Sequence, residues 1–191
     1  MRVRSAAPTR DSNCAKTMPF PLSNISLDQA ARLLVTPSAL GELSLSDARH
    51  ILGQMRARRV KAETVLLVEG ARVMGDFMML ILDGGVSVEI VMPGAQENLM
   101  IKVLGPGNLV GAMGMLDDGP RSATCTAATD LAVAVLSRSA LTRLMRERPD
   151  VAARFMLAVS VRLSQRLREM NQKLKLFVSI NNALQQEIDG G

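Results

Sequence analysis

Apolar residues follow two different periods along the chain, so their pattern predicts helices at both ends and strands in the centre. A first helix is predicted over residues 26–35, with Ser26 as its N-cap, and a second over residues 46–56. Between residues 59 and 136 the pattern changes to short apolar runs that Gly, Pro, Asn and Asp separate. Such runs are typical of antiparallel strands, and they comprise Val60 and residues 65–68, 78–82, 86–90, 99–104, 123–128 and 131–136.

Short strands at close spacing, with helices before and after them, predict a mainly β protein with flanking helices, of the α+β class. We expect an antiparallel jelly-roll β-barrel, in which residues 83–85 and 92–94 form tight reversals. One domain over residues 25–148 accommodates these elements. The preceding residues 1–24 form a basic tail that we expect to be disordered.

A long C-terminal helix is predicted over residues 149–191, because Pro149 suits a helix start and no further proline or glycine occurs before Gly190. Its apolar residues alternate in spacings of four and three, which is the heptad seam of a coiled coil. Asn181 is the one strongly polar residue on the seam and favours a parallel dimer. The alternative is that the helix packs back on its own domain. The predicted dimerisation residues are Leu163, Leu167, Met170, Leu174, Phe177, Asn181, Leu184 and Ile188.

The net charge of +5 is unevenly distributed, which argues against a nucleic-acid-binding protein. The central residues 25–137 carry −3, whereas residues 138–175 carry +7. We interpret the basic helix as a solvated face rather than as a phosphate-binding surface. The chain has four Phe and no Trp or Tyr, so it lacks the aromatic residues that stack on single-stranded nucleic acid.

Two cysteines and one histidine limit the chemistry that the chain supports. Cys14 and Cys125 do not form a disulfide framework, so a cytoplasmic location is expected. His50 lies among apolar residues of a predicted helix, where a structural or surface role is expected rather than a metal ligand. We expect no metal, no cofactor and no enzyme, because no nucleophile lies beside a base. No apolar run reaches the length of a membrane span, so no membrane partner is expected.

Residues 104–123 contain the parts of an anion-binding cradle. Residues 105–107 impose a tight turn after an apolar strand, and Gly111 allows backbone N–H groups to approach a ligand. A helical turn over residues 112–116 has unpaired N–H groups at its start. Arg121 stands alone as a cation in this segment, and in apolar surroundings its charge requires an anion.

This segment resembles the phosphate-binding cassette of the cyclic nucleotide-binding domains of the Crp/Fnr superfamily and of protein-kinase-A regulatory subunits. The family pattern F-G-E-L-A/G-L, followed by R-S/T-A, is similar to residues 110–115 and 121–123, and the family's hairpin pattern is similar to residues 69–88. Ala112 stands where the family carries a glutamate that binds the ribose 2′-hydroxyl. The resemblance implies that the cyclic phosphate and ribose contact Gly111, Ala112, Met113, Arg121, Ser122 and Ala123.

The resemblance implies a dimeric sensor that binds a cyclic nucleotide, most simply cAMP, and signals through its C-terminal helix to an unidentified protein. Ala112 implies a weakened affinity, and the base stays undetermined. DNA-binding members carry a helix-turn-helix domain after this helix, and none is recognised before Gly191, so direct sequence-specific DNA binding is not expected. Two alternatives stay open: a ligand-free interaction or dimerisation module with this fold, and a part of a Crp/Fnr-type transcription regulator.

Overall fold

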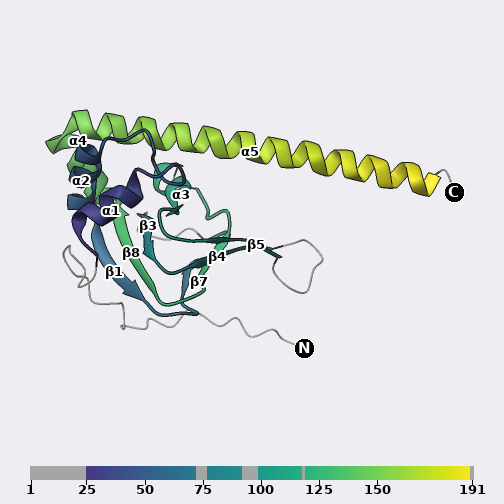
Figure 1. Ribbon diagram of the computed structural model, residues 1–191, viewed down its shortest axis with the longest axis horizontal. Helices are drawn as coiled ribbons and strands as arrows, with labels where there is room; N and C mark the ends of the chain where they lie inside the picture. The colour runs from purple at the N-terminus through teal and green to yellow at the C-terminus, as the bar shows by residue number, and fades with distance from the viewer. Residues whose placement is uncertain (1–24, 72–76, 92–98, 118, 190–191) are drawn as a thin grey trace.

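The computed structural model describes the domain and the long helix that follows it (Figure 1). The predicted disordered tail with Cys14, and the predicted turn at residues 92–94, lie outside the described residues. The described part consists of residues 25–71, 77–91, 99–117 and 119–189.

Eight strands of the described chain form two four-stranded antiparallel sheets. The strands are β1 (Arg56–Val60), β2 (Val65–Leu67), β3 (Phe77–Asp83), β4 (Val86–Ile90), β5 (Leu99–Leu104), β6 (Leu109–Val110), β7 (Thr124–Ala127) and β8 (Leu131–Ser137). The first sheet has the order β1-β8-β3-β6, and the second has the order β2-β7-β4-β5.

The strand pairs are nested along the chain, as in a jelly roll. β1 pairs with β8, β2 with β7, β3 with β6, and β4 with β5. The predicted fold class is therefore confirmed. Within the described residues, no ladder of hydrogen bonds joins the two sheets, so they form an open double-sheet structure rather than a closed barrel.

Two details of the predicted strands are wrong. The apolar pattern does not predict β6, because this strand has only two residues and is too short to show a period in the sequence. Residues 83–85 do not close a hairpin, because β3 and β4 pair within different sheets. Gly84 occupies this corner with a φ of 84°, and a Cβ there would lie 2.4 Å from the carbonyl oxygen of Asp130. The chain thus passes between the sheets at a point where only glycine fits.

The strand β3 is buried on both faces, which explains its continuous run of apolar residues. Met78, Leu80 and Leu82 pack into the core beneath the helices. The alternate residues Met79 and Ile81 pack into a second core between the sheets. The period of two along a strand sends neighbouring side chains into these two cores.

Four helices of the N- and C-terminal segments pack together beside the first sheet (Figure 1). The serine N-caps follow the usual pattern, because Ser26 forms a capping box with Gln29 and the Ser44 hydroxyl accepts from the N–H of Asp47 at 3.0 Å. The second helix therefore starts at Leu45, one residue before the predicted start. The helices are α1 (Leu27–Leu34), α2 (Leu45–Gln54), α3 (Ala112–Asp117), α4 (Arg138–Glu147) and α5 (Pro149–Asp189).

The helix α5 packs on the domain through its first third and then extends away from it (Figure 1). Val151, Phe155 and Val159 are buried in the helical core, whereas every residue from Leu167 to Ile188 is exposed. None of the helices in the described part of the chain combines the length and the apolar character needed to cross a membrane.

Candidate functional site

The predicted cradle forms where β6 leads into α3. Gly111 has a φ of 80°, a conformation that side chains disfavour. A Cβ at this position would also lie 3.0 Å from the carbonyl oxygen of Phe77 and 3.3 Å from Nη1 of Arg121. Gly111 thus allows the chain to turn tightly against β3 and directly beside the arginine.

Arg121 is buried at the centre of this site, with 6% of its surface exposed. Its Nη1 donates to the carbonyl of Gly111 at 3.0 Å, and its guanidinium carbon lies 5.3 Å from the centre of the Phe77 ring. The backbone is held in place because the N–H of Arg121 donates to Ala71 and its carbonyl accepts from Gly70. Nη2 is buried and has no hydrogen-bond partner among the residues that the structure describes. A buried guanidinium with a free donor is suited to bind an anion.

Gly114 makes room for this guanidinium, a role that sequence reasoning missed. A Cβ on Gly114 would lie 2.5 Å from Nη1 and 3.0 Å from Cζ of Arg121. The signal was the glycine inside the short helix α3, which carries a penalty of about 1 kcal/mol relative to alanine and therefore indicates a packing reason.

One cavity brings together all six residues predicted to contact the ligand. Ala112 is buried, Met113 and Ser122 are exposed, and Ala123 is partly exposed. The walls come from both sheets, from α3 and from α5. The cavity is lined by Leu67, Val88, Leu104, Leu109, Val110, Gly111, Ala112, Met113, Gly114, Pro120, Arg121, Ser122, Ala123, Cys125 and Arg166.

Arg166 reaches the same cavity from α5, so the cavity contains a second cation besides Arg121. Its Nη2 donates to the carbonyl of Leu109 at 3.2 Å. Burial lowers the pKa of the Arg166 guanidinium, and the positive charge of Arg162 adds to this effect. The family resemblance places Arg166 and Leu167 at the level where the long helix covers the base, but it assigns Arg166 no contact, and the packing of α5 brings Arg166 to the cavity.

Cys125 lines the cavity as a neutral group. Burial raises the pKa of its thiol to about 11, with a smaller opposing effect from the charge of Arg121. The thiol is therefore protonated at neutral pH and adds no negative charge to the cavity. Across the described residues, no cluster of three or more His, Cys, Asp or Glu side chains is arranged to hold a metal ion.

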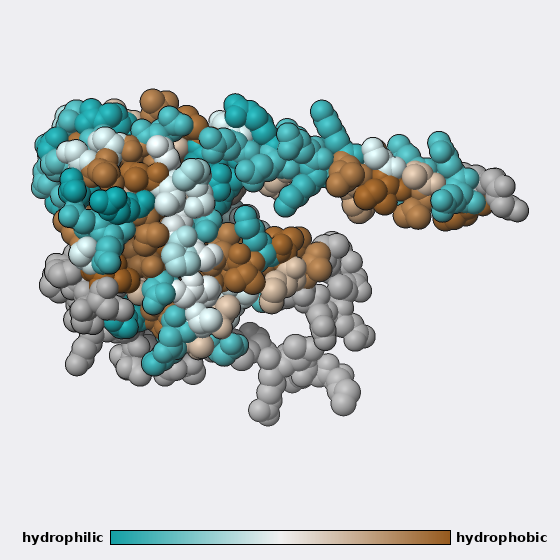
Figure 2. Space-filling model, viewed as in Figure 1, coloured by the Kyte–Doolittle hydropathy of each residue, from teal (hydrophilic) through white to brown (hydrophobic). Residues whose placement is uncertain are grey.

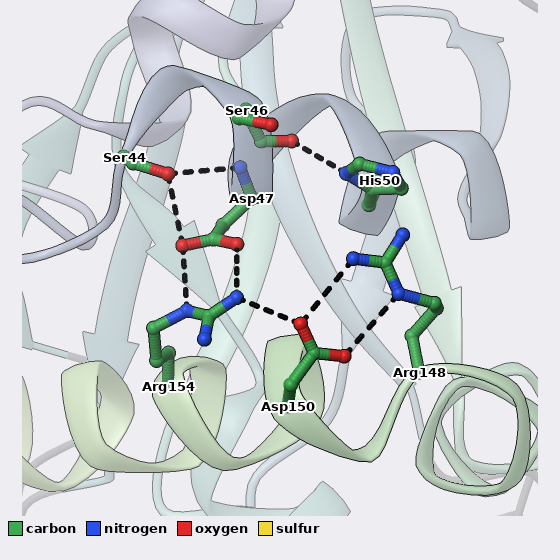
Figure 3. A network of polar contacts seen from close by, with 7 residues as sticks. All are labelled: Ser44, Ser46, Asp47, His50, Arg148, Asp150 and Arg154. Atoms are coloured by element: carbon green, nitrogen blue, oxygen red, sulfur yellow. Dashed lines mark hydrogen bonds and ion pairs between the residues drawn. The ribbon is translucent and has the colours of Figure 1, made fainter.

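A polar network joins the start of α5 to α2 (Figure 3). Arg154 donates from Nε and Nη2 to the two carboxylate oxygens of Asp47 at 2.9 and 2.8 Å. Arg154 also contacts Asp150, which in turn accepts from Arg148. The hydrogen bonds from Arg154 hold the pKa of the Asp47 carboxyl below its ordinary value. The network anchors the part of α5 that precedes Arg166.

His50 lies beside this network but has a local role, as the sequence analysis expected. Its Nδ1 donates to the carbonyl of Ser46 at 2.8 Å, one turn earlier in α2 (Figure 3).

The predicted dimerisation seam divides into two parts. Leu163 is partly buried against the core of its own domain, so only part of its side chain is available to a partner. The remaining apolar seam residues have exposed fractions from 54% to 74%, and Figure 2 shows an apolar strip along the free part of α5. These residues are Leu167, Met170, Leu174, Phe177, Leu184 and Ile188.

Comparison with known proteins connects this geometry to a family. Residues 57–148 match the profile of the family described as "Cyclic nucleotide-binding domain". The chain is similar to the CRP-like cAMP-activated global transcriptional regulator of Mycobacterium tuberculosis, with 29% identity over 100 residues, which cover 52% of this chain and 42% of that protein. The chain is also similar to the cyclic AMP receptor protein of Thermus thermophilus, with 35% identity over 103 residues. These residues cover 54% of this chain and 45% of that protein. The matched segment thus spans less than half the length of these relatives.

A solved structure extends the likeness to most of the chain. It is a cyclic nucleotide-binding domain from Methylobacillus flagellatus, with a TM-score of 0.67 and 29% identity, and the alignment covers 77% of this chain and 81% of that one. The likeness therefore includes flanking helices as well as the sheets.

Proposed function

We propose that this protein is a dimeric sensor that binds a cyclic nucleotide in the cavity beside Arg121, within the segment that matches the cyclic nucleotide-binding domain family. One observation carries the proposal: Arg121 is buried in this cavity and its Nη2 has no hydrogen-bond partner in the described part of the chain. A phosphate oxygen supplies the charge and the acceptor that this group lacks.

Each wall of the cavity has a separate part in binding. Arg121 pairs with the cyclic phosphate, and the exposed hydroxyl of Ser122 is available as a further donor. The apolar residues Leu67, Val88 and Leu104 form the remainder of the wall and exclude water from the ion pair. Ala112 provides no acceptor for a ribose hydroxyl, so we expect weak binding of cAMP or cGMP.

The helix α5 transmits the binding event. Arg166 joins α5 to the cavity through the carbonyl of Leu109, and the network around Asp47 fixes the start of the same helix. A ligand that contacts Arg166 competes with the Leu109 carbonyl, so binding changes the position of α5 relative to β6. The exposed seam from Leu167 onward then carries this change to a second copy of the chain.

The proposed role is regulatory and includes no catalytic step. We also propose a cytoplasmic location, because Cys125 is a buried free thiol in the described residues. Two observations support alternatives. Ala112 favours a ligand-free interaction module, and the short match to longer transcription regulators favours a part of such a regulator.

Calorimetric titration with cAMP and cGMP tests the proposal, with a thermal-shift measurement on the same samples. A bound ligand raises the melting temperature by mass action. Adenosine and guanosine are the matched controls, because they lack the phosphate that Arg121 would bind. Heat and thermal shift with the cyclic nucleotides alone support the sensor. Their absence at millimolar concentrations of both nucleotides contradicts it and favours the interaction module.

A further inference from the structure

The cavity carries more positive charge than one cyclic phosphate neutralises. Arg121 and Arg166 both line it, whereas none of its lining residues is an acid in the described part of the chain. The position of the family's glutamate, which carries one negative charge, is Ala112. Cys125 is also neutral, because burial keeps its thiol protonated.

Each of the two guanidiniums is held by a backbone carbonyl of the same short segment. Arg121 donates to the carbonyl of Gly111 at 3.0 Å, and Arg166 donates to the carbonyl of Leu109 at 3.2 Å. Leu109 and Gly111 are two residues apart at the end of β6. Both acceptors are neutral carbonyls, so neither contact neutralises a charge.

The charges around Arg166 do not remove this excess. Arg162 lies one turn earlier on α5 and is positive, and its Nη1 is 3.9 Å from a carboxylate oxygen of Glu169. Glu169 is exposed, and its attraction to Arg166 is weaker than the combined effects of burial and of Arg162. The three arginines and one glutamate leave two positive charges beside the cavity.

We infer that the cavity takes a nucleotide that carries two negative charges, with Arg121 on one and Arg166 on the other. This inference rests on the proposed function, because it assigns the ligand class of the same site. A cyclic mononucleotide carries one charge, so it leaves one of the two guanidinium charges unneutralised and competes only weakly with the Leu109 carbonyl for Arg166. A ligand with two charges draws Arg166 off that carbonyl and so also shifts α5.

Two kinds of nucleotide have this charge. A nucleoside 5′-monophosphate has one phosphate that carries nearly two negative charges above its second pKa of about 6. A cyclic dinucleotide has two phosphodiesters with one charge each. The pH dependence separates them, since the affinity for a monophosphate falls as the pH drops below about 6, whereas the charge of a cyclic dinucleotide stays constant.

The test is calorimetry of the full chain with cAMP, 5′-AMP and cyclic di-AMP, and with the three guanine equivalents, at constant ionic strength. We expect at least one doubly charged ligand to bind about tenfold more tightly than the cyclic mononucleotide of the same base, because it adds a charge-assisted hydrogen bond. Arg166→Gln should reduce the preference to near equality, because it removes the positive charge that only the second negative charge of the ligand would neutralise. Arg168→Gln is the matched control, because Arg168 is exposed on the same helix and does not line the cavity.

A second variant guards against misfolding of Arg166→Gln. Ala112→Glu adds one negative charge to the cavity, so it should weaken the doubly charged ligand and strengthen cAMP. The inference is overturned if cAMP binds as tightly as every doubly charged nucleotide, or if neither variant changes the preference. In that case the proposed function still stands. Absence of binding by all six nucleotides overturns both.

Discussion

At the scale of single residues, two glycines and one arginine decide the shape of the candidate site. Gly111 turns the chain beside Phe77, and Gly114 leaves space for the guanidinium of Arg121. Arg121 is thus enclosed by backbone and ring rather than paired with an acid among the described residues. A site of this kind is sensitive to the addition of single methyl groups.

Gly111→Ala is expected to destabilise the protein. Its positive φ costs a residue with a side chain about 1–2 kcal/mol, and the close carbonyl of Phe77 adds to this cost. Gly53→Ala is the matched control, because a Cβ on Gly53 would meet no atom within 4 Å and alanine favours helices by up to about 1 kcal/mol. Urea denaturation of both variants measures the difference. Equal stabilities would contradict the tight turn.

Arg121→Ala is expected to remove nucleotide binding while the domain stays folded. The loss of one partner of a desolvated ion pair reduces binding by about 2–5 kcal/mol. Arg146→Ala is the control, because Arg146 is exposed on α4. Calorimetry measures the binding and circular dichroism measures the fold. If Arg121→Ala unfolds the protein, the arginine has a structural role instead.

Ala112→Glu is expected to tighten cAMP binding by about tenfold to a hundredfold, because it adds a carboxylate acceptor for the ribose hydroxyl. Ala112→Gln is the matched control, because the glutamine side chain is similar in size to glutamate but has no charge. It should therefore tighten cAMP binding less than Ala112→Glu does. Calorimetry compares the three proteins. Equal affinities in all of them would show that position 112 does not contact the ligand.

At the scale of elements, the contact between α2 and α5 fixes the position of the first turns of α5 on the domain. The position of Arg166 along the same helix depends on this contact. Asp47 and Arg154 form this contact with two hydrogen bonds, and Asp47 is buried (Figure 3). By comparison, the ion pair between Arg49 and Asp28 joins α2 to α1 at an exposed position. Exposed pairs contribute little to stability, so the two pairs should respond differently to substitution.

Asp47→Asn is expected to lower the melting temperature by a few degrees, and Asp28→Asn to leave it nearly unchanged. The pKa of Asp47 is lowered on folding from its ordinary value of 3.8, so its contribution is fully present above that value. The contribution is lost as the pH falls through the lower pKa of the folded state. Thermal denaturation at pH 7 and at a series of lower pH values tests this. The difference in melting temperature between Asp47→Asn and Asp28→Asn should shrink as the pH falls. A constant difference would contradict the ion pair.

At the scale of the whole molecule, the free part of α5 exposes an apolar strip that its own domain does not cover. The helix continues for more than twenty residues after its last contact with the core at Leu163. Six apolar residues of the seam stay exposed there, and a second copy in parallel alignment would cover them. Figure 2 shows this strip facing away from the polar side of the helix.

Asn181→Leu is expected to stabilise the assembly and to loosen its oligomer number or register. A paired asparagine at such a seam position selects one register at some cost in stability. Asn182→Leu is the matched control, because Asn182 is the next residue and lies off the seam. Light scattering coupled to size exclusion gives the oligomer mass. A monomer for the natural chain and for both variants would contradict the dimer.

The sequence by itself determined the elements, because their signals are local. The period of apolar residues placed most strands, α1 and α5, and the serines placed the helix starts to within one or two residues. The glycines and Arg121 located the cradle before any contact was known. These signals depend on backbone conformation and on neighbours in the chain.

Only the tertiary structure decided which distant residues meet. It placed β3 and β4 in separate sheets, because that choice depends on pairing with β8 and β7 and not on residues 83–85. It packed Leu163 partly against the core of its own domain, and it brought Arg166 of α5 to the cavity of Arg121. Each of these outcomes depends on the packing of segments far apart in the chain, and a one-dimensional pattern contains no measure of that packing.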